Sequence, residues 1–498
     1  MNMEEARKSL KELQLKEFAY GQAMGTMHYD AVTGAPSETW APRGKATSIL
    51  SAEAYKLSSG EESGTLLNFL SAHEDELSEA ERRIVALKQK GLAELRSIPM
   101  DEYVAYSELI NESQSVWRKA KERSDYAMFE PYLKRIVAAK RRFAALVRPD
   151  MDPYDYLLDK YEEGLTGERC DEFFLTLRKS MIPLLKKMTA APQPEAGFLR
   201  TPFPEAAQLE LSHRLMRLMG IDMTHCGLAT TEHPFTMNFS KYDVRITTHF
   251  YEDDFASSLF STVHEGGHAL YELHTADEFA YTELGGGVSM GIHESQSRLY
   301  ENIFARSREF IGCIYPMLSE LCPALAGHTP EGFYRAVNMA KPSLIRTEAD
   351  EFTYYLHICV RYELEKALIS GTLTTADLPK RWNELYKQYL GVDVPDDAQG
   401  VLQDSHWSSG QIGYFPSYAL GSAYGAQLVT VMRETVDVPA CLAKGDFAPI
   451  NAWLEEHIWK YGALYKPAEL LERALGGPFD PHCYTDYLSD KAKDIYGI

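Results

Sequence analysis

The stretch TVHEGGHALYE, residues 262–272, constrains the fold of this chain most strongly, because it sets two histidines four residues apart around a pair of glycines. Each glycine inside a helix costs about 1 kcal/mol relative to alanine. Either the segment is not a helix, or something beside it needs the space. We favour the second interpretation: Gly266 and Gly267 let neighbouring backbone or substrate come close, as expected where a functional site overrides local propensity.

The flanking residues have the pattern of an amphipathic helix. Asp253 or Asp254 is suited to cap its N-terminus. The apolar residues that follow fall within roughly 80° on a helical wheel; they are Phe255, Leu259, Val263 and Leu270. His264 and His268 lie within about 40° of each other on a different face, one turn apart. Both imidazoles are therefore able to bind one metal ion.

The pattern His-Glu-x-x-His also puts Glu265 directly after the first histidine. Two neutral imidazoles bind zinc, and an adjacent carboxylate that does not bind the ion takes a proton from water. His264 and His268 are thus candidate metal ligands, and Glu265 is the candidate general base. The alternative is an ordinary helix with two unrelated histidines.

A catalytic zinc site needs a third protein ligand and an open position. Glu272 lies about 12 Å along the helix axis from the first histidine, which is too far for a shared ion. After the flexible glycines at 285–287, a helix beginning near Ser289 presents Glu294. Glu294 is the favoured third ligand, and the alternatives are Glu283 and Glu301.

Helical periodicity dominates the rest of the chain. A charged amphipathic pattern opens it. The pattern around 78–98 starts with a Ser-x-x-Glu capping signal at Ser78 and Glu81, and similar patterns recur around 103–123, 130–147, 168–189 and 205–219. Within 233–254, two β-leaning runs surround a polar turn, which predicts a small hairpin. The predicted fold class is mainly α: a large helical protein with a deep substrate groove and one small β-sheet next to the metal site.

We expect one unit over residues 1–498, with a helical N-terminal layer over roughly 1–150 and a catalytic region over roughly 151–498. The segment RPDMDPYDYLLDKYEEG, residues 148–164, is the strongest break between the two.

Charge and composition exclude several classes of protein. The chain has 498 residues and a formal net charge of -21, which argues against nucleic acid or an anionic membrane as a partner. Seven scattered cysteines without a CxxC pair are typical of reduced thiols. The N-terminus lacks the apolar core of a signal peptide, and no stretch reaches 18 uncharged apolar residues. These features predict a cytoplasmic protein.

Six motifs in order make the chain resemble, over nearly its whole length, the thermostable metallocarboxypeptidase family, also called the carboxypeptidase Taq family. The motifs are HPF from His233, DVRIT from Asp243, HEGGH from His264, HESQSR from His293, IRTEAD from Ile345 and GVLQDSHW from Gly400. The upstream DPYDYLLDKYEEG also resembles a family segment.

The resemblance implies a mostly helical fold with a long deep groove, similar to angiotensin-converting enzyme and neurolysin, and a homodimer. It implies an enzyme that removes single amino acids from peptide C-termini with broad specificity. It also implies zinc, for which cobalt sometimes substitutes. It makes His264, His268 and Glu294 the metal ligands and Glu265 the general base.

An enzyme of this kind must bind a free carboxylate, for which the guanidinium fork of arginine is well shaped. Arg346 is the first candidate and Arg245 the second. We expect a long helix with Pro342 near its first turn and Gly371 past its end. One face of it carries a polar stripe that lines the groove: Arg346, Asp350, Thr353 and His357. The alternative is that Arg346 only pairs with Asp350.

The segment QDSHWSSGQIGYFPSYALG offers hydrogen-bond donors for a developing oxyanion. His406 and Tyr418 are the candidates, with Tyr414 in reserve, and core packing is the alternative for His406. His233 and the hairpin edge after it are candidates for binding substrate backbone as an added strand. The alternative for His233 is core packing at a cis or rigid turn before Pro234.

Two alternative functions are a zinc oligopeptidase that cleaves internal bonds or releases dipeptides, and a non-catalytic helical peptide-binding scaffold.

Overall fold

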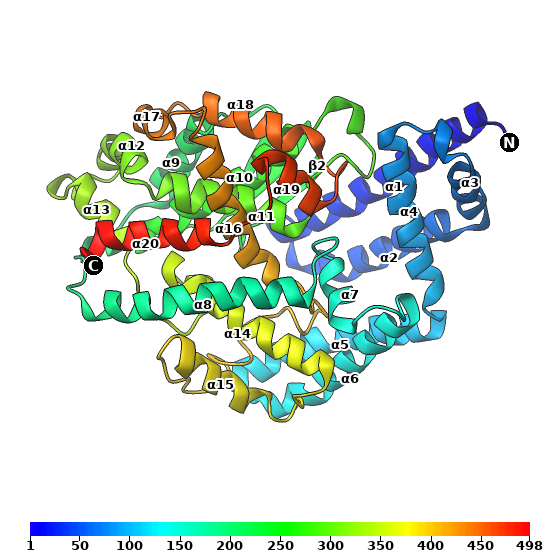
Figure 1. Ribbon diagram of the computed structural model, residues 1–498, viewed down its shortest axis with the longest axis horizontal. Helices are drawn as coiled ribbons and strands as arrows, with labels where there is room; N and C mark the ends of the chain where they lie inside the picture. Colours follow the sequence, from blue (N-terminus) through cyan, green and yellow to red (C-terminus); the bar gives the residue numbers. More distant parts are fainter.

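The computed structural model describes residues 1–498, apart from the side chains of residues 37, 40 and 41. Helices make up most of the molecule, and a three-stranded sheet lies among them (Figure 1). This confirms the predicted fold class. The two termini lie at opposite ends of the long axis. Within the described residues, none of the helices combines the length and the apolar character needed to cross a bilayer.

The N-terminal helices occupy one end of the molecule and part of its lower side in Figure 1: α1 (Met3–Thr33), α2 (Trp40–Ser59), α3 (Glu61–Ala72), α4 (Glu79–Ser97), α5 (Met100–Arg123) and α6 (Tyr126–Val147). The helices around the centre follow: α7 (Pro153–Asp159), α8 (Gly167–Ala190), α9 (Glu205–Leu218), α10 (Phe255–Leu273), α11 (Met290–Arg298), α12 (Arg308–Leu321), α13 (Pro330–Val337), α14 (Glu351–Ser370), α15 (Leu378–Tyr389) and α16 (Phe415–Met432). The last helices are α17 (Val438–Lys444), α18 (Ala448–His457), α19 (Pro467–Leu475) and α20 (His482–Tyr496).

Local signals in the sequence predicted several helix boundaries correctly. Ser78 and Glu81 form a capping box at the start of α4, in which each side chain accepts the other residue's backbone N–H. Helix α10 begins directly after Asp254, and its predicted apolar face is buried. Ser289 accepts the N–H of Ile292 at 3.1 Å and so caps α11. The starts of α4 and α11 depend on hydrogen bonds within one turn, which a sequence reveals, whereas the Asp254 side chain makes no capping hydrogen bond to α10.

The sheet contains the predicted hairpin and one further strand. Strand β2 (Thr236–Ser240) pairs antiparallel with β3 (Asp243–Thr248), and β1 (Cys226–Thr230) pairs parallel with β3. The order β1-β3-β2 leaves β2 at an edge. Strand β1, CGLAT, was not predicted, because it is short, contains a glycine and joins the sheet through a parallel pairing that leaves no local turn signal.

Buried apolar residues form one large core and one smaller cluster. The smaller cluster joins α1, α3 and α4 to Phe279 and Leu284, in the loop that leads to α11. The large core includes α5 to α8 and the remaining central helices. The segment 148–164 lies in this core through Tyr154 and Leu158. The division into two layers near residue 150 stays a prediction.

The helix expected from Pro342 begins later than predicted. Helix α14 starts at Glu351, because the Asp350 carboxylate caps it by accepting the N–H of Phe352 at 2.9 Å and the hydroxyl of Thr353 at 2.8 Å. Gly371 ends the helix in the left-handed conformation, as predicted. Arg346 lies before the helix, in the short turn η7 (Arg346–Glu348).

The predicted groove-lining polar stripe is therefore wrong. Thr353 and His357 are on α14 but are fully buried, and Arg346 is not on the helix. The partner predicted for Arg346 as an alternative, Asp350, is engaged by the first turn of α14. The sequence pattern extended the predicted helix through Asp350, but Asp350 is the N-cap, so the helix begins after it.

Gly266 and Gly267 of α10 lie where neighbouring segments pack too closely to leave room for a Cβ atom. A Cβ on Gly267 would lie 2.7 Å from the backbone oxygen of Gln296 in α11, and one on Gly266 would lie 2.7 Å from the Cε of Met219. On the opposite side of α11, a Cβ on Gly421 of α16 would lie 2.6 Å from the Cβ of Glu294. Glycines on both flanking helices thus let α11 pack at backbone contact.

Gly267→Ala is expected to destabilise the protein by about 1–3 kcal/mol, because its methyl group would overlap backbone atoms of α11, which cannot move aside as a flexible side chain can. Gly312→Ala is the matched control: this exposed glycine inside α12 has nothing within 4 Å of an added Cβ. The control is expected to gain up to about 1 kcal/mol from helix propensity. Thermal unfolding of both variants measures the contrast, and equal effects would contradict the packing explanation.

Candidate metal centre and active site

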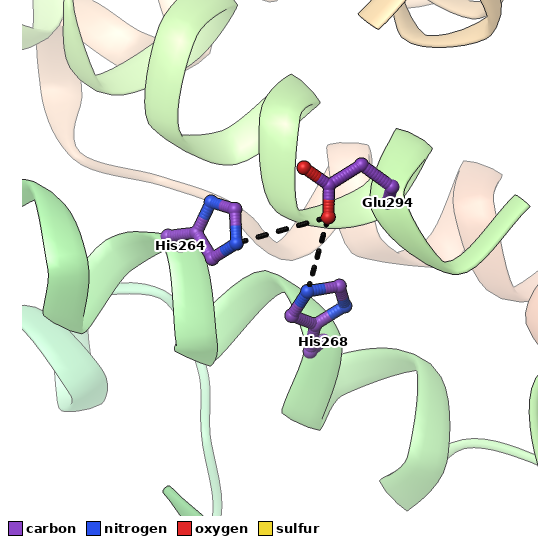
Figure 2. A group of neighbouring side chains, drawn as sticks. All are labelled: His264, His268 and Glu294. Carbon is purple, nitrogen blue, oxygen red and sulfur yellow. Dashed lines mark ion pairs between the residues drawn. The ribbon is translucent and has the colours of Figure 1, made fainter. Parts of the chain in front are cut away.

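Helices α10 and α11 bring three donor side chains to one point (Figure 2). His264, His268 and Glu294 each offer a ligand atom, and these atoms all lie within 4.8 Å of one another. The Oε2 atom of Glu294 is 3.9 Å from Nε2 of His264 and 3.5 Å from Nε2 of His268. The structure thus brings together the three residues that the sequence and the resemblance selected as ligands.

The donor set fits a divalent metal ion. Two imidazoles and a carboxylate are a known ligand combination of catalytic zinc, and ligands of a tetrahedral zinc ion lie about 3.3 Å apart. The observed separations of 3.5 and 3.9 Å are close to that value.

In both His264 and His268, the Nδ1 atom makes a hydrogen bond that orients the ring. The Nδ1 atom of His264 lies 2.9 Å from Glu301, and the Nδ1 atom of His268 lies 2.6 Å from Nδ1 of His293. Each Nε2 is left to face Glu294. Hydrogen bonds of this kind fix the tautomer and orientation of a metal-binding imidazole.

The electrostatics favour the metal-binding forms of Glu294 and His268, whereas burial opposes the charge on His264 but Glu294 and Glu301 raise its pKa. Burial opposes the charge on Glu294, but Arg298, whose Nε is 2.7 Å from Oε1, and His264 together hold the pKa of this carboxyl below its usual range. Burial lowers the pKa of His268 to about 4, so this imidazole is neutral near pH 7. A carboxylate and a neutral imidazole are the forms that bind metal.

Glu265 lies beside these residues and is hydrogen-bonded to the sheet. Burial raises the pKa of its carboxyl, and the hydroxyl of Thr236 donates to Oε2 at 2.6 Å. A buried carboxylate with a raised pKa next to a metal site has the properties of a general base.

The alternative third ligands lie elsewhere. Glu301 lies in the π-helical turn η5 (Leu299–Ala305) and contacts the far nitrogen of His264. Glu283 pairs with Lys88 of α4 and accepts a hydrogen bond from Gln14 of α1. Glu272, which was excluded by distance, binds His293 at 2.5 Å. Glu301 thus supports His264 directly, and Glu272 supports His268 through His293.

Arg346 is buried and paired with a residue that the sequence did not indicate. Its Nε donates to Asp404 Oδ1 at 2.8 Å, and its Nη1 donates to the Tyr354 hydroxyl at 3.1 Å. Asp404 also accepts from Arg361 at 2.6 Å. Although burial opposes the charge, Asp404 raises the pKa of Arg346 above its usual value. The guanidinium lies 5.1 Å from the ring centre of Tyr418, so Arg346 belongs to the same group of residues as that tyrosine.

Arg245 lies on the other face of the sheet from the metal centre. It is paired in register with Met237, whereas the side chains of Thr236 and Asn238 point to α10. Both Nε and Nη2 of Arg245 bind Asp243 at 2.8 Å. Its guanidinium faces the Tyr29 ring and a cavity of about 770 Å³ beside α1.

The proposed oxyanion donors form a cluster. The His406 Nε2 is 3.1 Å from the Tyr418 hydroxyl, and the Tyr414 and Tyr418 rings are 4.9 Å apart. Burial lowers the pKa of His406 to about 4 and raises that of Tyr414 to about 12. All three side chains are therefore neutral near pH 7. His233 is exposed, at the turn before β2.

Glu365 is a supporting residue that the sequence analysis missed. It is fully buried in α14 and accepts hydrogen bonds from Trp407 at 2.8 Å, the Gly413 N–H at 2.9 Å and the Tyr154 hydroxyl at 3.1 Å. These contacts anchor the segment that carries His406. The signal was absent because a single glutamate inside a helix has no pattern.

A helical protein with a two-histidine, one-glutamate centre and a buried carboxylate beside it belongs to the class of metal-dependent hydrolases. Comparison with known proteins identifies the kind of hydrolase. The family model described as carboxypeptidase Taq (M32) metallopeptidase matches residues 9–492. The chain belongs to this family, and the protein is a metallocarboxypeptidase.

Curated relatives and solved structures agree with this assignment. The chain is 39% identical over 480 residues to carboxypeptidase 1 of Bacillus subtilis (strain 168), covering 96% of both chains. It is 37% identical over 483 residues to thermostable carboxypeptidase 1 of Pyrococcus furiosus, covering 95% of this chain and 96% of the relative. The M32 carboxypeptidase from Deinococcus radiodurans R1 superposes with a TM-score of 0.96 at 34% identity, over 99% of this chain and 100% of the other.

The Glu365 carboxyl gives the stability of the protein a testable pH dependence. Burial raises its pKa from the ordinary 4.5 to about 7, although Trp407 and Gly413 donate to it. The folded state thus holds the proton more tightly than the unfolded state. The contribution of Glu365 to the free energy of unfolding is fully present below about pH 4.5. It is lost as the pH rises through 7, and the loss amounts to up to about 3 kcal/mol.

Glu365→Gln stays neutral and is expected to lack this loss. Between pH 5 and pH 8, the melting temperature of the variant relative to wild type should rise by about 3 °C, as measured by calorimetry. The exposed Glu168→Gln is the control and should follow the wild-type profile. Parallel profiles for Glu365→Gln and wild type would contradict the raised pKa.

Proposed function

We propose that this metallocarboxypeptidase uses zinc, replaceable by cobalt, to remove single amino acids from peptide C-termini with broad specificity. The observation that carries the proposal is the convergence of His264, His268 and Glu294 beside the buried Glu265. The family match and the relatives named carboxypeptidase support an action at the C-terminus.

The residues divide the chemical work as follows. A divalent ion held by His264, His268 and Glu294 supplies Lewis acidity for the scissile carbonyl and acidifies water. Glu265 accepts a proton from the attacking water and delivers it to the leaving amine. Glu265 is suited to both steps because its burial favours the protonated form that follows the first transfer.

His406 and Tyr418 are the proposed donors to the oxyanion. The hydrogen bond between His406 and Tyr418, 3.1 Å long, orients the two side chains. Both are neutral at pH 7, so the Tyr418 hydroxyl is a neutral hydrogen-bond donor to the oxyanion. Tyr414, whose ring packs against Tyr418, orients it and contacts substrate.

Arg346 is the proposed receptor for the substrate carboxylate. Asp404 and Tyr354 hold its Nε and Nη1, while its Nη2 makes no hydrogen bond to the described residues. Arg245, the second candidate, is less favoured because it faces α1 across the sheet. The edge strand β2 and His233 before it are suited to pair with the peptide backbone.

A homodimer and a cytoplasmic location complete the proposal. The family resemblance supports the dimer, and the seven free cysteines fit a reducing compartment.

The first experiment compares a peptide that has a free C-terminus with its amidated twin, following products by mass spectrometry. Stepwise loss of single residues from the free acid only is expected. A chelator should abolish it, and zinc or cobalt should restore it. Internal cleavage of both peptides would identify an oligopeptidase, release of two-residue products would identify a dipeptidase-type enzyme, and a protein that holds no metal and gives no products would be a scaffold.

Glu265→Gln is expected to keep zinc, since Glu265 is not a ligand, and to lower kcat at least about 10³-fold through loss of the base. Metal analysis and steady-state kinetics on the same preparation measure both quantities. Near-normal turnover in this variant would refute the assignment of the base.

Arg346→Lys is expected to raise KM for a free-acid peptide strongly and to lower kcat/KM about 100-fold, because an ammonium group does not reproduce the planar fork. Arg245→Lys is the matched control, since its guanidinium is also paired with an aspartate and packed on a tyrosine. The reverse order of effects would make Arg245 the carboxylate receptor.

A further inference from the structure

The side of β2 that faces α10 carries two polar residues that contact the active-site helix. Thr236 donates its hydroxyl to Glu265 Oε2 at 2.6 Å. Asn238, two residues later and so on the same face, donates its amide to Glu272 Oε2. Glu265 and Glu272 are seven residues apart on α10, which places them on the same side of that helix, two turns apart. The strand is thus tied to the metal helix at two points.

The second of these points leads back to the metal centre. Glu272 Oε1 lies 2.5 Å from Nε2 of His293, and Nδ1 of His293 lies 2.6 Å from Nδ1 of His268. To present a lone pair on Nε2 to the metal, His268 must carry its proton on Nδ1, so it donates to His293. His293 then carries its own proton on Nε2 and donates it to Glu272. Every donor in this chain has an acceptor, and the direction of each hydrogen bond follows from the first.

Two of the glycines before α11, Gly286 and Gly287, pack directly against residues of this chain of hydrogen bonds. A Cβ on Gly287 would overlap the imidazole of His293, and one on Gly286 would lie 3.2 Å from Glu272 Oε2. The Gly287 N–H also points to Glu272 Oε1, at 3.4 Å. Gly286 and Gly287 therefore leave space for the supporting residues, whereas Gly285 leaves space for the Phe279 backbone oxygen, 2.6 Å from an added Cβ.

His264 and His268 are supported in different ways. Glu301, which is itself held by Arg298 and Arg306, binds His264 directly from within the helical layer. His268 is supported through the sheet. Any displacement of β2 along α10 is thus transmitted to the base through Thr236 and to one metal ligand through Asn238.

We propose that the inner face of β2 aligns the active site: Thr236 positions the Glu265 carboxylate, and Asn238 positions His268 through Glu272 and His293. These are positioning residues that act through the base and a ligand. The inference rests on the proposed function, in which Glu265 is the base and His268 binds zinc. It couples the strand that is suited to pair with substrate to the two groups that carry out the reaction.

The first half is tested with Thr236→Val and Thr236→Ser. The valine variant removes the hydroxyl at nearly constant volume, and we expect kcat to fall about 10–100-fold with KM and zinc affinity unchanged. The serine variant should restore most of kcat. Thr262→Val is the matched control, since Thr262 is buried in α10 and its hydroxyl bonds only Ser212, at 3.0 Å. Wild-type kcat in Thr236→Val, or an equal loss of kcat in Thr262→Val, would overturn the claim that Thr236 positions Glu265.

The second half is tested by metal binding, without turnover. Zinc affinity is measured by competition with a chelator on the metal-free protein, and the ligand field by the visible spectrum of the cobalt form. His293→Phe fills the space without an acceptor for His268, so we expect zinc to bind about 10–100-fold more weakly and the cobalt spectrum to change. His293→Asn keeps an acceptor near the Nδ1 position and should lose less.

His274→Phe is the control at the C-cap of the same helix, because among the described residues His274 hydrogen-bonds only the Leu270 backbone oxygen, at 2.7 Å, and it packs beside Trp459. Unchanged affinity in His293→Phe, or equal weakening in His274→Phe, would overturn the second half. Should His293→Phe fail to fold, His293→Asn and Asn238→Leu decide the question by the same measurements. Loss of turnover in Glu265→Gln together with wild-type behaviour of these variants would refute this inference alone, whereas retained turnover in Glu265→Gln would refute the proposed function.

Discussion

The metal centre depends on the backbone approach of α11 to its two neighbours. Helices that pack through side chains lie 8–10 Å apart, and glycines at the contact allow closer packing. Gly267 on α10 and Gly421 on α16 leave room for the backbone and the Cβ of α11. Glu294 comes within reach of both histidines only because α11 is that close. The glycines lower helix propensity, and the packing that they permit offsets this loss.

The surrounding charges follow from the same close packing. Two carboxylates, two imidazoles and two arginines lie in a largely buried region, where each charge requires a partner. Arg298 binds Glu294 and Glu301, and Arg306 also binds Glu301, so the two arginines offset these two carboxylates. The Arg346–Asp404–Arg361 group repeats this arrangement near the proposed substrate carboxylate. Pairing keeps these arginines charged and in place despite their burial.

The sheet is small but connects several functional parts. One face of it packs on α10 through Thr236 and Asn238, and the other faces α1 through Met237, Phe239 and Arg245. This alternation turns Arg245, the second candidate for the substrate carboxylate, toward the N-terminal helices. Arg346 lies outside the sheet, in η7, and its guanidinium is near Tyr354 and Tyr418. A period of two along β3 thus directs one of the two arginines away from the metal centre.

The sequence by itself determined most of what depends on contacts within a turn or two. Helical spacing put His264 and His268 on one face, capping serines marked the starts of α4 and α11, and two β-leaning runs around a polar turn marked the hairpin. The six motifs determined the family. Only the tertiary structure decided which groups meet across the chain: Asp404 with Arg346, Glu301 with His264, Glu365 with Trp407, and His293 with His268. Such pairs join residues 25 to 58 positions apart, and no local periodicity encodes them. The stripe predicted through Arg346 was wrong for a local reason: the Asp350 carboxylate caps the first turn of α14, so the helix begins after a residue through which periodicity alone had extended it.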